Sequence, residues 1–198
     1  VAHIQSQYDK GITLEWVGIS MGGLIGMILA IQPNVLVPIK KLVLSDIGPL
    51  IPAVALRRIA DYVGKDPRFD SFEAFKNYMK AISVSFGPLT EEQWNHMAIH
   101  SAHQYEDGSY GFRYDPRIAI SFKEHEIQDI YLWEQWDQLK VPTLVLRGMQ
   151  SDVLTIETAA QMQARGAKAK VVELPGVGHA PMIMDDQQIQ IVRDFILN

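Results

Sequence analysis

Cysteine is absent from this sequence of 198 residues. Without thiols the chain cannot form disulfide bonds, thiolate metal sites or a cysteine nucleophile. Long apolar runs are missing as well, because the best candidate, Gly22 to Ile31, is interrupted and shorter than the roughly 18 residues that a membrane span requires. We therefore expect no membrane partner and a cytoplasmic location.

Basic residues do not gather into a stripe. The 18 lysines and arginines are interspersed among 23 aspartates and glutamates, which leaves a formal charge of −5. Such a chain cannot neutralise a run of phosphates, so we expect no nucleic-acid partner and a small-molecule substrate instead. The composition, 47% hydrophobic and 21% charged, is typical of a globular protein with one main core. It leaves the oligomeric state open.

Four short apolar runs predict buried strands, at residues 13–18, 41–46, 141–147 and 169–174. Helical segments follow three of these runs, at residues 21–32, 156–165 and 185–197. Strands with apolar neighbours on both sides, alternating with helices, are typical of a parallel sheet that is covered on both faces. We predict an α/β fold with a doubly wound parallel sheet.

About 90 residues separate the second and third predicted strands, far more than a usual connection. Helical spacing recurs there at residues 57–63, 71–85 and 91–103. We predict a core made of residues 1–48 and 140–198, with residues 49–139 inserted as a helical cap. The cap is expected over the carboxyl ends of the strands, where open α/β sheets bind ligands.

A strand-turn-helix motif contains the first candidate for chemistry. Gly18-Ile19-Ser20-Met21-Gly22 matches G-x-S-x-G, the nucleophile elbow. The sharp turn is expected to hold Ser20 in strained geometry, with glycine needed at positions 18 and 22 to leave room for backbone. The Met21 amide, at the helix N-terminus, is then placed to donate to a developing oxyanion.

Two further polar residues follow the third and fourth predicted strands. Asp152 and His179 both lie in loops at carboxyl ends of strands, so they should meet Ser20 at one edge of the sheet. The chain order Ser, Asp, His also fits this elbow. We predict Ser20 as nucleophile, Asp152 as acid and His179 as base. Asp46, after the second strand, is an alternative acid, although a capping or hinge role is favoured for it.

With these motifs the chain resembles the C-terminal two-thirds of a capped α/β-hydrolase. Leu44 to Pro49 and Gly176 to Pro181 carry the resemblance further. It implies a serine hydrolase that cleaves an ester or lactone of a small to medium apolar substrate through an acyl-enzyme, without a cofactor. A carbon-carbon bond hydrolase of aromatic-degradation diketones, and a ligand-binding module with little or no catalysis, remain alternatives.

The resemblance also predicts what should precede the first strand. Four more strands and a loop with a second oxyanion-hole amide are expected there, and this sequence does not contain them. The opening residues, Val1 to Tyr8, look like the tail of a helix.

Apolar residues near the predicted site suggest a pocket lining. We predict substrate contacts from Trp136, Met149 and Met182. His96, His100 and His103 share one helical face, but no H-E-x-x-H pattern accompanies them, so no metal site is predicted. A substrate carboxylate could bind to a cap arginine, although solvated surface is the default for each of the four candidates, Arg57, Arg58, Arg113 and Arg117.

Overall fold

A parallel sheet organises the larger part of the protein. The computed structural model describes residues 12–33 and 37–198, so the helix tail predicted at residues 1–8 lies outside the described residues. The sheet has four strands in the order β1-β2-β7-β8, all parallel. Their bounds are β1 Leu14–Ile19, β2 Ile39–Ser45, β7 Thr143–Gly148 and β8 Lys170–Leu174. The α/β prediction is confirmed.

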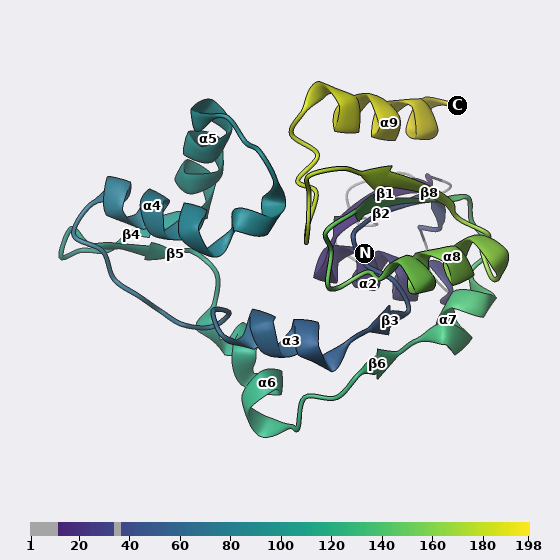
Figure 1. The fold of residues 1–198 in the computed structure, drawn as a ribbon, viewed down its shortest axis with the longest axis horizontal. Coiled ribbons are helices and arrows are strands. Elements are labelled where there is room, and N and C mark those ends of the chain that lie inside the picture. Colours follow the sequence, from purple (N-terminus) through teal and green to yellow (C-terminus); the bar gives the residue numbers. More distant parts are fainter. Residues whose placement is uncertain (1–11, 34–36) are drawn as a thin grey trace.

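Helices cover both faces of this sheet (Figure 1). One face carries α2 Met21–Ala30, α7 Trp133–Gln138 and α8 Ile156–Ala164, and the other carries α9 Asp186–Leu197. Leu42 and Leu44 of β2 pack with Met27 of α2, whereas Val43 packs with Val192 of α9. Successive residues of a strand point to opposite faces of the sheet. A strand with helices packed on both faces therefore needs a continuous apolar run.

Residues 49–139, called the inserted segment below, leave the sheet after β2 and return before β7. Their two ends run side by side as a short antiparallel ribbon of β3 Leu50–Ile51 and β6 Ile130–Tyr131. Asp129 supports the ribbon by accepting a 2.7 Å hydrogen bond from the Ala53 amide. This ribbon explains how so long an insertion joins the sheet at one place.

The inserted segment has a small core of its own. Phe75 and Met79 of α4 pack there against Trp94 and Ala98 of α5. A Thr90 and Gln93 capping box starts α5, which satisfies amides that the first turn leaves free. The elements of the segment, besides β3 and β6, are α3 Ala53–Ala60, α4 Phe72–Ile82, η1 Val84–Phe86, α5 Glu91–Ser101, β4 Ala102–Gln104, β5 Tyr110–Phe112, η2 Pro116–Ala119 and α6 Ile120–Glu124.

Helix ends in the inserted segment differ from the predicted ones. The helix expected to reach residue 103 stops at Ser101, because Ala102 instead pairs with Phe112 in a β-hairpin. The helix expected to start at residue 57 begins at Ala53, directly after Pro52. Strand pairing sets the first boundary and the position of the proline sets the second. The spacing of apolar residues, from which the helices were predicted, indicates neither.

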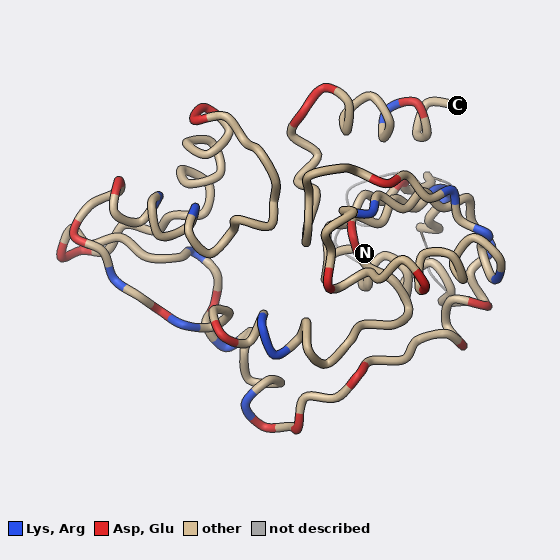
Figure 2. The backbone as a smooth tube through the Cα atoms, in the orientation of Figure 1, with Lys and Arg blue, Asp and Glu red and all other residues tan. Residues whose placement is uncertain are grey.

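Charged residues of both signs are interspersed over the backbone (Figure 2). Within the described residues, no helix combines the length and the apolar character that crossing a lipid bilayer demands.

Candidate active site

Ser20 lies in the turn between β1 and α2, as the motif predicted. Its φ of 50° places a side-chain-bearing residue in the left-handed region, which costs conformational energy and occurs where surrounding structure enforces it. The Ser20 amide donates to the Ser45 carbonyl at 3.0 Å, and its carbonyl accepts from the amides of Gly23 and Leu24. These bonds hold the hydroxyl at the carboxyl edge of the sheet.

The glycines of the motif play different roles from those expected. A Cβ on Gly18 would lie 2.4 Å from the backbone of Gly22, so only glycine fits at position 18. A Cβ on Gly22 would meet nothing within 4 Å, and the expected crowding there is wrong. The second close approach falls on Gly23, where a Cβ would lie 2.6 Å from the side chain of Ile47.

Three side chains form a continuous hydrogen-bonded relay. The hydroxyl oxygen of Ser20 lies 2.8 Å from Nε2 of His179. On the other side of the ring, Nδ1 of His179 lies 2.9 Å from Oδ2 of Asp46. Asp46 is fully buried and His179 is 7% exposed, so bulk water does not compete for the bond between them.

Asp46 is fixed by partners of its own. Its Oδ1 accepts a 2.8 Å hydrogen bond from the Gly148 amide, and its Oδ2 also accepts one from the Ser151 hydroxyl. Both donors belong to the end of β7 and the loop after it. The carboxylate therefore bridges two neighbouring strands of the sheet while it faces the imidazole.

The loop that carries His179 is held by the inserted segment. Ser85 in η1 accepts a 2.7 Å hydrogen bond from the Gly178 amide, and its hydroxyl donates to the His179 carbonyl. From the core, the Ser45 hydroxyl donates to the Pro181 carbonyl at 2.7 Å. Contacts from both parts of the chain thus set the position of the imidazole.

Asp152 does not make the contact that was predicted for it. Its two carboxylate oxygens accept from Nε and Nη2 of Arg58, at 2.6 and 2.7 Å, and no hydrogen bond joins it to His179. The Arg58 hydrogen bonds hold the pKa of the Asp152 carboxyl below its ordinary value. The side chain that faces Nδ1 is Asp46, which the sequence suggested only as the alternative.

A cavity of about 480 Å³ opens beside the relay. Ser20 and His179 line one side of it, and Met21 and Met182 also border it. Most of the remaining lining is apolar, from Ile47, Ile51, Leu56, Ile59, Phe86 and Phe122 among others. Such a space fits a hydrocarbon-rich acyl or alkyl group next to a reactive hydroxyl.

Two of the three predicted substrate contacts lie elsewhere. Trp136 is completely buried in the main core, and its indole N–H donates to the Arg165 carbonyl at 3.0 Å. Met149 is 52% exposed and is not among the residues that line this cavity or its neighbour beside Met182. Met182 does line the cavity, and its contact with a substrate stays a prediction.

The histidines of α5 do not converge. The rings of His96 and His100 lie 4.5 Å apart, while His103 packs against Tyr105. In the described part of the chain, no cluster of three or more potential ligands is placed to hold a metal ion.

The position of β2 in the sheet explains why Asp46, and not Asp152, faces the imidazole. β2 lies between β1, which ends directly before Ser20, and β7, which precedes Asp152. Asp46 directly follows β2 and is therefore central at the edge where the side chains meet. In the sequence, Ser45-Asp46 at the end of a predicted strand indicates a candidate acid. Only the strand order distinguishes it from Asp152.

Comparison with known proteins places this arrangement in a family. Residues 16–192 match the model of the Alpha/beta hydrolase family. The chain belongs to that family. Among its relatives, the 3-hydroxybutyrate-oligomer hydrolase of Cupriavidus necator is 43% identical over 190 residues, which cover 92% of this chain and 64% of that protein. This member of the alpha/beta hydrolase family thus spans less than two thirds of that relative.

Solved structures show the same alpha/beta hydrolase fold. An alpha/beta hydrolase from Novosphingobium aromaticivorans is 29% identical with a TM-score of 0.82, covering 99% of this chain and 68% of its own. An esterase from Mycobacterium tuberculosis is 26% identical with a TM-score of 0.68, covering 100% of this chain and 65% of its own.

Proposed function

We propose that the protein is a serine hydrolase that cleaves carboxylic esters through an acyl-enzyme. The observation that carries this proposal is the relay from Ser20 through His179 to Asp46, with distances of 2.8 and 2.9 Å. A serine hydroxyl becomes a competent nucleophile when an adjacent base removes its proton and a third group orients that base.

The reaction proceeds in two halves. Nε2 of His179 takes the Ser20 proton as the oxygen attacks the ester carbonyl, and the same nitrogen then protonates the departing alcohol. Water, activated by His179, attacks the acyl-enzyme and releases the acid. Met21 is the first residue of α2, so no carbonyl of the helix can accept its N–H, and we assign that N–H to the oxyanion of each tetrahedral intermediate.

Asp46 is proposed as the acid of the triad. It accepts from Nδ1 and so selects the tautomer that leaves Nε2 free to take the serine proton. It also stabilises the imidazolium that forms in each half-reaction. Asp152 instead accepts from Arg58 through both of its oxygens, and Asp46 is the carboxylate within hydrogen-bond distance of Nδ1.

The substrate is proposed to be a short oligoester of a hydroxy acid. The apolar cavity beside Ser20 suits hydrocarbon units joined by ester groups. A relative that is 43% identical carries the name 3-hydroxybutyrate-oligomer hydrolase. Since the inserted segment lines much of this cavity, we further propose that it acts as the lid of the site.

A carbon-carbon bond hydrolase is less well supported by the same geometry. Such a reaction calls for a cap arginine facing the reacting diketone. Among the described residues that line the cavity at Ser20, none is an arginine. A turnover panel of 3-hydroxybutyrate oligomers against ring-cleavage diketones separates the two reactions directly.

The decisive experiment combines covalent labelling with turnover. A fluorophosphonate probe should label the protein, and hydrolysis of a 3-hydroxybutyrate trimer should be followed by titration of released acid. Ser20→Ala should abolish labelling and lower turnover to background, whereas Ser109→Ala, in a surface turn, should change neither. Labelling that persists in Ser20→Ala, or a protein that neither reacts with the probe nor cleaves any ester, would refute the proposal.

A further inference from the structure

A second cavity, of about 570 Å³, adjoins the one at Ser20. The two share four lining residues, Tyr62, Val63, Phe86 and Met182. The rest of the second cavity comes from the inserted segment, and apolar side chains such as Met79, Met97 and Phe112 dominate it. The two cavities are therefore neighbours, and a chain-like ligand that extends beyond the first would meet the second beside Met182.

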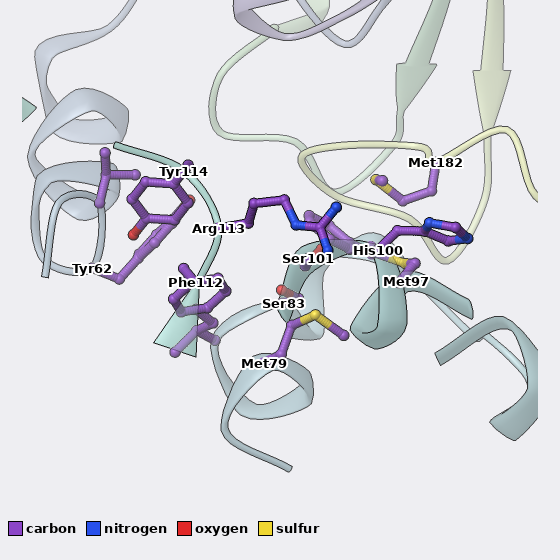
Figure 3. Close-up of a pocket in the computed structure, with 13 residues that line it drawn as sticks. Tyr62, Met79, Ser83, Met97, His100, Ser101, Phe112, Arg113, Tyr114 and Met182 are labelled. Carbon is purple, nitrogen blue, oxygen red and sulfur yellow. The ribbon is translucent and has the colours of Figure 1, made fainter. Parts of the chain in front are cut away.

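Arg113 is the cationic side chain in this second cavity. Figure 3 shows its guanidinium on the side of the cavity that carries His100 and Met182, away from Tyr62 and Tyr114. The Arg113 amide donates to the Ser101 carbonyl at 2.9 Å, and Nε donates to the Ala102 carbonyl at 3.2 Å. These two bonds hold the stem of the side chain, and neither terminal nitrogen donates a hydrogen bond within the described residues.

The guanidinium of Arg113 lacks an acidic partner in the part of the chain that the structure describes. Several other arginines form ion pairs with an aspartate or glutamate, namely Arg58, Arg68, Arg117, Arg147 and Arg165. For Arg113 no carboxylate of residues 12–33 or 37–198 lies within 4.0 Å. Arg113 is exposed to solvent where it borders this apolar lining. A guanidinium with free donors at such a place is suited to bind a planar carboxylate by donating two parallel hydrogen bonds.

We propose that Arg113 binds the free carboxylate at the acid end of an oligoester substrate while an ester carbonyl of the same molecule lies at Ser20. This inference rests on the proposed function and adds to it the orientation in which the substrate binds. The fragment that carries the free carboxylate is the alcohol part of the ester being cleaved. It accepts the proton from His179 and leaves first, and the hydroxyl-terminal part stays on Ser20 until water releases it.

The test compares a charged substrate with a neutral one that has the same chain. Wild-type protein, Arg113→Gln and Arg113→Lys are assayed on a 3-hydroxybutyrate trimer and on its methyl ester. Arg113→Gln should lower kcat/KM for the acid about 10- to 100-fold, mainly through KM, because charge-assisted hydrogen bonds to the carboxylate are lost. It should change kcat/KM for the methyl ester less than about threefold, since that substrate places no charge there.

Two controls make the result specific. Arg113→Lys keeps the charge without the planar fork, so an intermediate loss on the acid is expected, and it replaces Arg113→Gln if that variant does not fold. Arg117→Gln removes an arginine that pairs with Asp115 and lines neither cavity, so both substrates should be hydrolysed as by the wild type.

The outcomes separate this inference from the proposed function. If the wild type hydrolyses both substrates and the Arg113 variants lose activity equally on both, or on neither, the carboxylate site is refuted while the hydrolase stands. If the wild type hydrolyses neither substrate and resists the fluorophosphonate probe, the proposed function fails first.

Discussion

Arg58 and Asp152 form a two-point ion pair that connects the inserted segment to the core. The guanidinium belongs to α3 and the carboxylate to the loop after β7, and both side chains are about 40% exposed, at 39% and 42%. The pair explains why a carboxylate so near the relay is not part of it. It also gives the contact between the two parts of the chain a dependence on pH.

Loss of this ion pair should lower stability only where Asp152 is charged. The pKa of Asp152 is lowered in the folded protein by its hydrogen bonds from Arg58, so the stabilisation is complete above the ordinary value of 3.8 and disappears as pH falls below it. At about pH 7, Arg58→Gln should lower the melting temperature by about 1 to 3 °C, a value already reduced for solvent screening. Calorimetric scans from about pH 7 to about pH 3 should show the difference closing. A difference that stays constant over this range would contradict the assignment.

Neutralising the two candidate acids should have very different effects on turnover. Asp46→Asn should lower kcat by about 10³- to 10⁴-fold, because the amide cannot hold the productive tautomer of His179 or stabilise its charged form. Asp152→Asn should lower kcat by less than about tenfold, since it removes an exposed ion pair. Steady-state kinetics on one ester substrate decides between them. The reverse ranking would return the acid role to Asp152.

The glycines of the elbow form a matched pair for a stability measurement. Gly18→Ala should lower the free energy of unfolding by about 1 to 3 kcal/mol, because its Cβ would lie 2.4 Å from backbone atoms. Gly22→Ala meets open space within α2 and should be neutral or stabilising by up to about 1 kcal/mol. Urea denaturation of both variants measures the difference. Equal destabilisation by the two would mean that the turn is not packed as described.

Substitutions of Trp136 and Met182 should affect different properties, the first stability and the second substrate binding. Trp136→Phe removes the indole donor of the fully buried Trp136 to the Arg165 carbonyl and should lower the free energy of unfolding by about 1 to 3 kcal/mol without changing KM. Met182→Ala should raise KM by about tenfold, since apolar contact area in both cavities is lost. Denaturation curves and KM values for both variants are required. A raised KM in Trp136→Phe would restore its predicted role in the pocket.

The sheet and two of the three relay residues could be predicted from local sequence. The apolar runs around Val43 and Val145 require cover on two faces, and that requirement is visible without coordinates. The elbow at Ser20 and the loop at His179 are short motifs whose geometry depends on neighbours in sequence.

The acid could not be chosen in the same way, because the choice depends on partners that are distant in sequence. Asp46 and Asp152 both follow strands that end at the same edge of the sheet. Asp152 pairs with Arg58, 94 positions before it, whereas Asp46 faces the imidazole from the strand between the other two. Trp136 shows the same limitation, since an aromatic residue fits a core and a pocket equally well until its neighbours are known.

The narrow β3 and β6 ribbon makes the inserted segment look easy to exchange, since both crossing points of the chain lie side by side. Ser85 shows what an exchange would lose. A transplanted segment without a serine at that turn would leave the His179 carbonyl without its hydroxyl donor. A turn of different backbone shape would also remove the carbonyl that accepts from the Gly178 amide, and the loop of the base would lose both contacts. Redesign of substrate range in this chain can therefore change cavity-lining side chains of the inserted segment, provided that the turn at residues 84–86 is kept.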